Sequence, residues 1–495
     1  MYIKKMVLHN FKSFSSNNSE DEDIEIPFAS GVNYLVGNNN VGKTTILNAL
    51  DFLTTGGKKE NVITNGHEQE NVSVTIVIDN VNPFAGSLKK YNPYINNHQL
   101  TLKRSSEENT VKQGKDGKEK NVKFDIKKVR VFNYQKNQFE NPTGIGSTIT
   151  DLIDPQIVYA DMHNEDYQDF GTTKTTGKLI QIITKEFQTG PEFAALKEAH
   201  KKAFGDNGIQ KYLNDTERNI DEILSDQFGD SKMEFKFDFP NVNDLIKKGN
   251  ILSTENGIET DISEKGNGLQ RALALAIIQV YSKVSTKDEN TQFLIDEPEI
   301  YLHPKAQDKL IDSLVNLSKN GDQVFITTHS PYILRHYHED NDSIIVLSLK
   351  KEGNQKEIDF VDSLLFSPTS IGEVTYKAFG VPNVDLHQLL FTKIYIYWIR
   401  NKKTKDSSLS AFDDDFLQPE CNKQSLPPQS YFPRVRGKWK AEQQRTIPYI
   451  VRNEIDHPET LDDPNRNVWN EDNLKQSIDC LLVIYKGLNI NNTID

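Results

Sequence analysis

A lysine and a threonine close a glycine-containing loop near the start of the chain. The octapeptide GNNNVGKT matches every fixed position of the pattern G-x-x-x-x-G-K-[ST]. Backbone N–H groups of such a loop surround phosphate oxygens, the lysine reaches the terminal phosphates and the hydroxyl binds Mg²⁺. We therefore expect a site for a nucleoside triphosphate and Mg²⁺, with Thr44 as a metal ligand. The loop residues expected to bind the nucleotide are Gly37, Asn38, Asn39, Asn40, Val41, Gly42, Lys43, Thr44 and Thr45.

Two further segments could supply the chemistry of hydrolysis. FLIDEPE is an apolar run that ends in Asp296 and Glu297. Asp296 would hold Mg²⁺ together with Thr44, and Glu297 would polarise the attacking water. VFITTHS is a second apolar run, and His329 at its end could hydrogen-bond the γ-phosphate or the water. The alternatives are an acidic helix cap for the carboxylates and a structural role for the histidine. We predict Lys43, Glu297 and His329 as catalytic.

A fourth segment, ISEKGNGLQRALALAII, opens a helix with a turn rich in serine and glycine. Amides at a helix N-terminus can bind an anion, and glycines permit close approach of the backbone. One copy of the chain could not easily aim this turn at its own phosphate loop. We therefore expect the turn to complete the site of a second copy, through Ser263, Gly266, Asn267 and Gly268.

The chain pattern supplies elements that could position these residues. A short apolar strand precedes the loop and an apolar helix follows it, which is the context that a phosphate-binding loop needs. Strand-like runs dominate residues 70–135, with MEFKFDF as a later strand, and helical runs dominate 176–229. The predicted domains are 1–175 (first half of the head with a β-rich lobe), 176–260 (helical arm), 261–365 (second half of the head) and 366–495 (helical C-terminal domain).

Together with the opening IKKMVLHNFKSF, these segments resemble the ABC-type ATPases of the SMC/RecF/OLD branch over residues 1–345. The resemblance implies an α/β fold: a P-loop NTPase head of the ABC/SMC-like type, with an inserted helical arm and an all-α C-terminal domain. In that family ATP lies between the phosphate loop of one subunit and the signature turn of another. A homodimer or higher homo-oligomer closed by ATP is thus implied. The turn departs from LSGGQ and is closer to the GxGxQR of OLD- and RecF-like members.

The C-terminal segments SPTSIGEVTYKAFGVPNVDLHQLL and YIVRNEIDHPE look similar to the tails of defence-associated bacterial ATPases. PtuA-type subunits of Septu and related retron systems, which work beside a separately encoded HNH nuclease, share this pattern. The resemblance implies a sensor or regulatory subunit of an antiphage system that controls a partner nuclease. A DNA repair ATPase of the RecF kind is an alternative.

A second possible chemistry lies in RNEIDH, which fits the R-x(4)-H spacing of HEPN ribonucleases. Arg452 would stabilise the developing phosphorane charge, Asn453 is the polar residue after it, and His457 would move the 2′-OH proton. The alternatives are an inactive HEPN-like interaction domain and an unrelated helical domain. Residues 401–435, including Asp413–Asp415, are predicted as a polar loop or insertion.

Composition narrows the class of protein. The net charge of -13 over 495 residues excludes a uniformly basic coat for nucleic acid. Locally, Lys103–Arg130 carries ten Lys/Arg against five Asp/Glu, and Arg434–Lys440 is also basic, so contact with DNA or RNA is open beside a solvated-loop interpretation. No stretch approaches the ~20 apolar residues of a membrane span. Two cysteines without CxxC spacing, Cys421 and Cys480, argue against a disulfide framework or zinc hook and favour the cytoplasm.

Overall fold

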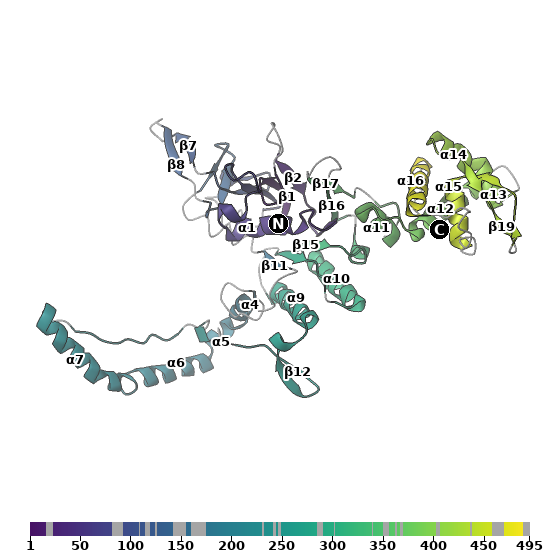
Figure 1. Cartoon of the computed structure of the whole chain (residues 1–495). Coiled ribbons are helices and arrows are strands. Elements are labelled where there is room, and N and C mark those ends of the chain that lie inside the picture. Colours follow the sequence, from purple (N-terminus) through teal and green to yellow (C-terminus); the bar gives the residue numbers. More distant parts are fainter. Residues whose placement is uncertain are drawn as a thin grey trace. The chain divides into compact units, whose positions relative to one another are not determined.

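The chain divides into two units, and each is described by itself. Figure 1 labels helices and strands of both units. The first comprises 1–153, 295–299 and 303–495, and the second comprises 154–294 and 300–302. The computed structural model describes residues 1–15, 23–81, 93–107, 109–113, 119–123, 126–141, 155–159, 175–229, 232–240, 244–245, 249–284, 291–300, 302–338, 340–349, 356–361, 364–366, 370–401, 406–435, 438–457 and 470–488. None of the described helices is long and apolar enough to cross a membrane.

An antiparallel sheet forms the β-rich lobe of the first unit. Its strands follow the order β10-β9-β6-β4-β1-β2, and β5 pairs with β6. Their bounds are β1 Tyr2–His9, β2 Ile24–Pro27, β4 Ser73–Asp79, β5 Ile95–Asn96, β6 Gln99–Ser105, β9 Arg130–Asn133 and β10 Gln138–Glu140. In β4 the even-numbered residues 74, 76 and 78 are buried, which is the period of a half-buried strand.

The basic segment 103–130 is partly structural. Arg104 donates hydrogen bonds to the carbonyls of Leu53, Thr54 and Ile126, and Arg130 pairs with Glu107 from a buried position. Two of its basic residues therefore hold the lobe together and are not displayed to solvent. Between them, β7 (Asn109–Gln113) and β8 (Glu119–Lys123) form a separate hairpin. The side chains of the hairpin lie outside the described residues, so the prediction of nucleic-acid contact there stays a prediction.

A largely parallel sheet carries the phosphate loop. Strand β3 (Val32–Gly37) lies between β15 (Gln323–Thr328) and β16 (Ser343–Leu349), parallel to both, and β17 (Lys356–Phe360) pairs antiparallel with β16. All six residues of β3 are buried, as expected of a central strand covered on both faces. Helix α1 (Lys43–Thr55) follows the loop, and β14 (Gln292–Asp296) brings its last two residues into this unit. The site thus forms at the carboxyl ends of parallel strands, where open α/β sheets bind ligands.

Helices dominate the C-terminal region of the first unit. Its core joins helices α12, α15 and α16 through residues such as Leu390, Val451 and Leu481. The elements are α11 Ile371–Phe379, α12 Val384–Asn401, α13 Leu409–Phe412, a π-helical turn Asp413–Leu417, α14 Gln418–Lys423, β18 Gln429–Tyr431, β19 Arg434–Val435, β20 Lys438–Trp439, β21 Gln443–Arg445, α15 Ile447–Asp456 and α16 Glu471–Gly487. Two small hairpins, β18–β21 and β19–β20, therefore add strands to the all-α domain that the sequence predicts.

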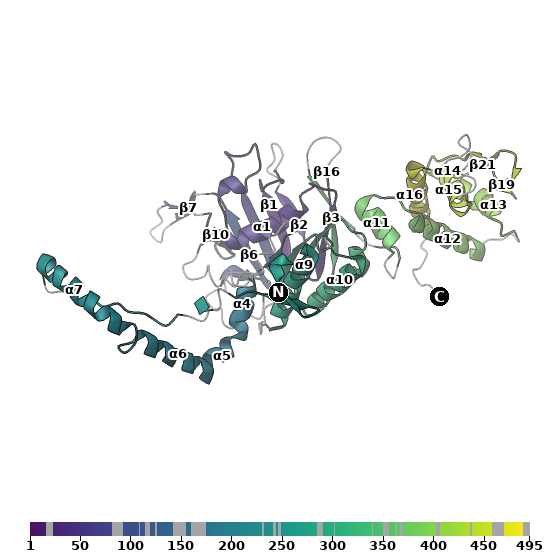
Figure 2. The ribbon, with the colours of Figure 1, turned by 60° about the horizontal axis from the view of Figure 1, so that its bottom comes forward.

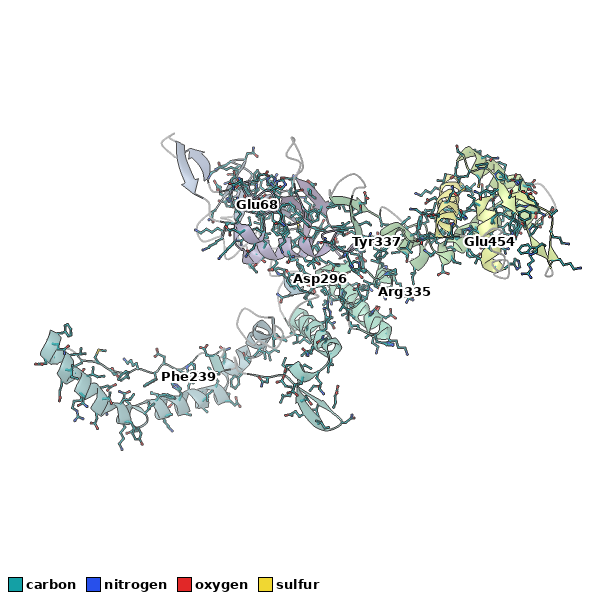
Figure 3. The ribbon with its side chains drawn as sticks, in the orientation of Figure 1. Glu68, Phe239, Asp296, Arg335, Tyr337 and Glu454 are labelled. Carbon is teal, nitrogen blue, oxygen red and sulfur yellow. The ribbon has the colours of Figure 1, made fainter. Side chains whose placement is uncertain are left out.

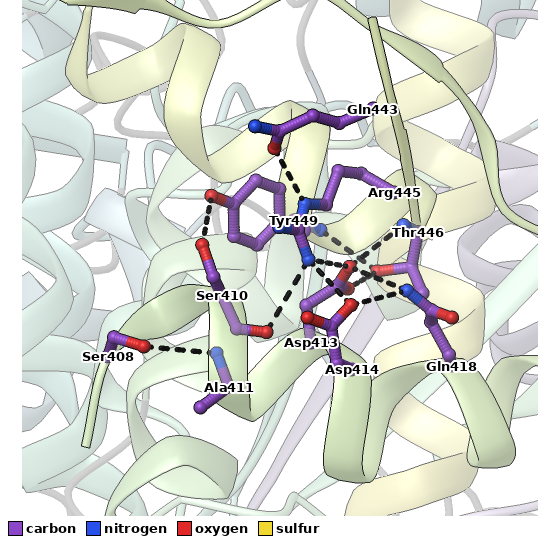
Figure 4. Close-up of polar contacts among 10 residues, drawn as sticks. All are labelled: Ser408, Ser410, Ala411, Asp413, Asp414, Gln418, Gln443, Arg445, Thr446 and Tyr449. Carbon is purple, nitrogen blue, oxygen red and sulfur yellow. Dashed lines mark hydrogen bonds and ion pairs between the residues drawn. The ribbon is translucent and has the colours of Figure 1, made fainter. Parts of the chain in front are cut away.

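The prediction of a polar loop at 401–435 is wrong for its described part. Asp413 is fully buried, and its carboxylate accepts a hydrogen bond from Thr446 and pairs with Arg445 (Figure 4). Arg445 also pairs with Asp414 at 2.7 Å. Burial raises the pKa of Asp413, and the neighbouring donors oppose that shift. The three consecutive aspartates look like a solvated run in the sequence, but Asp413 fixes the start of α15 through the N-cap residue of that helix, Thr446.

Cys421 and Cys480 lie in the hydrophobic core of the C-terminal helices. Their sulfur atoms are 3.2 Å apart, and both are free thiols.

The second unit contains the helical arm and the helix that begins in the signature turn. This helix, α9 (Asn267–Val284), packs against α4 (Thr175–Ile183) and β11 (Gln156–Val158). From α4 the chain continues through α5 Lys185–Thr189, α6 Pro191–Phe204 and α7 Gln210–Phe228, and returns to the hairpin β12 Leu252–Glu255 and β13 Ile258–Asp261. Figure 2 shows the long arm that α6 and α7 form. Residues 233–239, predicted as a strand, are extended but join none of the sheets of the described residues.

Candidate nucleotide-binding site

The phosphate loop has a backbone that its glycines make possible. Gly37 and Gly42 have φ of 141° and 107°, where residues with a Cβ are strained. A Cβ on Gly37 would also lie 2.1 Å from the carbonyl oxygen of Leu347. The loop borders a cavity of about 290 Å³ in the first unit. The cavity is lined by Ser13, Asn39, Asn40, Gly42, Lys43, Thr44, Thr45, Glu297 and His329.

Lys43 is held inside the loop by three hydrogen bonds. Its Nζ donates to the carbonyls of Gly37 at 3.1 Å and Asn38 at 2.9 Å, and lies 2.8 Å from Nε2 of His329. Burial lowers the pKa of the ammonium, and three nearby carboxylates oppose that shift. The donors of Lys43 are thus already aimed into the loop, and phosphate oxygens would replace the carbonyl and imidazole acceptors that the side chain contacts in this structure.

Nε2 of His329 lies between Lys43 and Glu297 and cannot form a hydrogen bond with both at the same time. Nε2 is 2.8 Å from Lys43 Nζ and 3.1 Å from Glu297 Oε1. An ammonium only donates, so the contact with Lys43 needs an unprotonated Nε2, whereas the contact with Glu297 needs Nε2–H. A phosphate that takes over Lys43 would free His329 to bond Glu297 or the phosphate itself. We therefore expect phosphate at the loop to change the hydrogen bonding of Glu297, the carboxylate predicted as the catalytic base.

Thr44 and Asp296 supply an oxygen donor set for a metal ion. The Thr44 hydroxyl lies 3.0 Å and 3.2 Å from the two oxygens of Asp296, a residue that is 4% exposed at the end of β14 (labelled in Figure 3). The Thr327 hydroxyl also donates to Asp296. A carboxylate at such a depth is costly unless hydrogen bonds or a cation satisfy it. Because Mg²⁺ prefers hard oxygen ligands, this hydroxyl–carboxylate pair fits the ion.

Glu297 lines the cavity from a strained backbone conformation. Its φ of 46° lies in the left-handed region, which costs a residue with a side chain about 1–3 kcal/mol. Two hydrogen bonds hold this conformation: the amide of Glu297 donates to the carbonyl of Thr327 at 3.1 Å and to its hydroxyl at 2.9 Å. Thr327, on the neighbouring strand β15, therefore contacts both Asp296, the predicted metal ligand, and Glu297, the predicted base.

Glu299 is a residue of this site that the sequence analysis missed. Its Oε1 accepts hydrogen bonds from the Thr328 hydroxyl at 2.7 Å and from the His329 amide at 2.9 Å. Its buried Oε2 has no hydrogen-bond partner among the residues that the structure describes. Glu299 thus ties the segment after β14 to the segment that carries His329. The signal was present in the sequence, since EPE places a second carboxylate two residues after Glu297.

Replacing Glu299 tests whether it positions His329. We expect Glu299→Ala to lower kcat about 10-fold while leaving the Kd for ATP nearly unchanged, because the loop itself is untouched. Glu299→Gln keeps the accepting oxygen and should recover part of the loss. The measurements are steady-state phosphate release and fluorescent-nucleotide binding, with the exposed Glu60→Ala as a matched control. Equal kcat values for Glu299→Ala and Glu60→Ala would refute the role.

The signature turn lies in the second unit and is ordered by its own hydrogen bonds. Asp261 accepts from the amide of Ser263 at 2.9 Å and from its hydroxyl at 2.6 Å, and Gln270 donates to the carbonyls of Ser263 and Lys265. Ser263, Gly266 and Asn267 are exposed, and Gly268 is half-buried in the first turn of α9. The turn therefore presents an edge that is available to a ligand or to another molecule.

The C-terminal candidate residues lie at the end of α15. Arg452 pairs with Asp456 at 2.6 Å and donates to Asn453 at 3.0 Å, and His457 follows the last helical residue, exposed. Buried His387 lies beside Arg452, and burial and that guanidinium lower its pKa to about 3. The structure thus places Arg452 and Asn453 in direct contact. The arginine charge faces Asp456, a partner that the R-x(4)-H pattern does not include.

Comparison with known proteins finds two nucleases of similar sequence. The Old nuclease of Escherichia phage P2 is 30% identical over 372 residues, which cover 68% of this chain and 58% of that protein. The OLD nuclease of Thermus scotoductus is 23% identical over 379 residues, 72% of this chain and 66% of its own length. The chain thus spans less than two thirds of either relative.

Two further matches concern the head. An SMC head bound to the C-winged helix domain of ScpA shares 18% identity with a TM-score of 0.45, over 73% of this chain and 98% of that one. The profile of the AAA ATPase domain family matches residues 1–334, the segment that holds the phosphate loop, the signature turn, Asp296, Glu297 and His329. The chain therefore belongs to the AAA ATPase domain family.

Proposed function

We propose that this ATPase of the OLD, SMC and RecF type is the regulatory subunit of a bacterial antiphage system and controls a nuclease on a separate polypeptide. The observation that carries the proposal is the position of His329 Nε2 between Lys43 and Glu297. Because Nε2 can bond one of these groups at a time, the hydrogen bonding of the Glu297 carboxylate depends on whether the loop holds phosphate. A site of this kind suits a protein that reports nucleotide occupancy as well as one that only consumes ATP.

In the proposed reaction Lys43 and the loop amides hold the β- and γ-phosphates. Glu297 accepts a proton from the attacking water, and His329 orients that water or the γ-phosphate. Thr44 and Asp296 would hold Mg²⁺, which supplies neutralising charge on the phosphate oxygens when bound. The signature turn of a second copy would contact the γ-phosphate from the other side. ATP binding would therefore close two copies, and hydrolysis would release them.

Helix α11 offers a route from the head to the C-terminal helices. It packs against β3, which leads into the phosphate loop, and also against α12. Its Glu373 is fully buried, and its carboxylate accepts from the amides of Leu365 and Phe366 and pairs with Lys377 at 2.7 Å. A helix anchored in this way transmits a shift of β3 as a rigid body. We propose that the C-terminal helices are the output that contacts the nuclease.

Co-purification of the whole complex tests the proposal. The tagged chain would be expressed with its neighbouring genes, and a nuclease should co-elute and cut DNA in a manner that depends on ATP. Lys43→Ala should keep the association but remove the ATP dependence, because the loop loses its phosphate cation. The two names "Old nuclease" and "OLD nuclease" support nuclease chemistry in this context. DNA cleavage by the purified chain alone would overturn the division of labour proposed here.

A HEPN-type ribonuclease in the chain itself is the second candidate. The observation that favours it is the contact of Arg452 with Asn453, one turn before His457. Arg452→Ala and His457→Ala would each be compared with the exposed Lys438→Ala for phage protection and for cleavage of cellular RNA. Loss in both variants, with ATP turnover unchanged, would support the ribonuclease. Full protection in both would end this alternative.

A further inference from the structure

Two thiols face each other in the core of the C-terminal helices. Cys421 lies on α14 and Cys480 on α16, helices that are both labelled in Figure 1, and the chain has no other cysteine. Each of the two residues is 1% exposed, and their sulfur atoms are 3.2 Å apart. A disulfide needs a sulfur–sulfur distance of about 2.05 Å, so a movement of roughly 1 Å would join them. The two residues are therefore placed to be oxidised as a pair.

The two thiols differ in acidity. The hydrogen bond from the Cys421 thiol lowers the pKa of Cys480, Gln424 lowers it further, and burial opposes both. The same hydrogen bond raises the pKa of Cys421, and burial and the charges of Asp413 and Glu420 raise it further. Because the thiolate is the nucleophilic form of cysteine, Cys480 is the sulfur that reacts first with an oxidant, and Cys421 is the one that follows.

Helix α14 gives the pair a route to solvent. It has six residues, Gln418–Lys423, and so short a helix is not stable by itself. Its end is held by the amides of Gln424 and Leu426, which both donate to the carbonyl of Cys421 at 3.0 Å. Ser425 between them has a φ of 60°, where a residue with a side chain is strained. Local opening of such a segment costs less free energy than global unfolding, so small solutes can reach the thiols of the folded chain.

The surroundings of the pair select a small, uncharged oxidant. The two cysteines share a core with apolar side chains such as Leu417, Ile478 and Leu481. A charged oxidant such as glutathione disulfide would lose its hydration in such a core, which is costly. Hydrogen peroxide carries no charge and is little larger than water. A peroxide is therefore the class of oxidant that fits this site.

We propose that Cys421 and Cys480 form a peroxide-dependent thiol–disulfide switch that cross-links α14 to α16. The Cys480 sulfur attacks one oxygen of hydrogen peroxide, the O–O bond breaks, and Cys480 becomes a sulfenic acid as one water leaves. The Cys421 sulfur then attacks the Cys480 sulfur, the S–O bond breaks, and the hydroxide leaves with the thiol proton as a second water. Two thiols and one peroxide thus give one disulfide and two waters, and a dithiol such as dithiothreitol reverses the oxidation.

The disulfide would restrain the helices around it. It closes the loop 421–480, which contains α15 and both small hairpins, and a cross-link over a long loop restricts the opened states of the chain. Asp479, next to Cys480, accepts a hydrogen bond from Tyr376 on α11, the helix that packs against β3 and α12. Oxidation therefore stiffens the region that we propose as the output to the nuclease. This last step rests on the proposed function, whereas the formation of the disulfide does not.

Thiol counting on the full-length chain tests the switch. After treatment with hydrogen peroxide and unfolding, the wild type should have lost both thiols together, with two hydrogen atoms less in its intact mass, and dithiothreitol should restore both. Glutathione disulfide should react about 10-fold more slowly, because it is large and charged. Thiols that do not react, oxidation of one cysteine alone, or a disulfide between two chains would overturn the proposal. Equal rates with glutathione disulfide would overturn the choice of peroxide.

Single substitutions test which sulfur reacts first. Cys421→Ser keeps a hydrogen-bond donor beside Cys480, so a sulfenic acid should form at Cys480 and be trapped by dimedone. Cys421→Ala removes the donor and should slow the trapping about 10-fold. In Cys480→Ser, the remaining Cys421 should be trapped as slowly. Thermal unfolding of the reduced variants would show that the fold is kept. Trapping of Cys421 as fast as Cys480 would refute the order of the two steps.

Hydrogen exchange shows whether the disulfide restrains α14. The amides of Gln424 and Leu426 should exchange about 10-fold more slowly in the oxidised wild type than in the reduced one, because the cross-link limits the opening of α14. Cys421→Ser treated with the same peroxide is the matched control and should show no slowing. Unchanged exchange in a fully oxidised wild type would refute the restraint. None of these measurements involves the nuclease, so a failure of the proposed function would leave them unchanged.

Discussion

Glu297→Gln is expected to stop ATP turnover while ATP binding persists. The amide has the shape of the carboxylate but cannot accept the proton of the attacking water, and a positioned base contributes about 10²–10⁴-fold. The left-handed backbone of Glu297 is held by Thr327 through main-chain and hydroxyl bonds that the substitution leaves in place. The loss should therefore appear in kcat and not in the Kd for ATP.

Phosphate release and nucleotide binding measured on the same preparation would check this expectation. Glu60→Gln is the matched control, because Glu60 is exposed and outside the cavity. The variant should also accumulate ATP-bound dimers in light scattering, since closure would no longer be followed by hydrolysis. Turnover at the wild-type rate would remove Glu297 as the base. Glu299 would then be the next carboxylate to test, because its Oε1 accepts a hydrogen bond from the amide of His329.

Residues fixed by short motifs were predictable from the sequence. The phosphate loop, Asp296, Glu297 and His329 all follow apolar runs, and the structure brings Lys43, Glu297 and His329 to one cavity of the first unit. The expectation of an α/β head is confirmed by the parallel sheet and by the family match. Such motifs are readable because each lies within one short stretch of the chain, at the end of its own strand or in its own loop.

Residues that act through a neighbouring strand were not predictable in the same way. Thr327 and Glu299 matter because β15 lies beside the end of β14, and no spacing in the chain states that adjacency. Asp413 shows the same limit in the C-terminal region, since its burial depends on Arg445 and Thr446, over 30 residues away. A polar run reads as solvated until the partners that satisfy it are known.

Two inactive variants are expected to restore each other's ATPase activity when mixed. Lys43→Ala removes the phosphate cation, and Gly266→Glu places a carboxylate on the exposed edge of the signature turn, where it would repel the γ-phosphate of the partner's ATP. A side chain at Gly266 meets no atom of its own chain within 4 Å, so the fold should tolerate it. Each variant alone should lose nearly all turnover, because every composite site of its dimer carries a defect.

In a mixed dimer, the intact loop of the Gly266→Glu copy faces the intact signature turn of the Lys43→Ala copy. One of its two sites is then whole. Random exchange makes half of the dimers mixed, so activity should return to about a quarter of wild type. Gly487→Glu, equally open around its Cβ but in α16, is the control and should stay active alone. Differently tagged copies purified in sequence would isolate the mixed dimer. An inactive mixed dimer would contradict an ATP site shared between two copies. An active Gly266→Glu homodimer would show that the signature turn is not part of the ATP site.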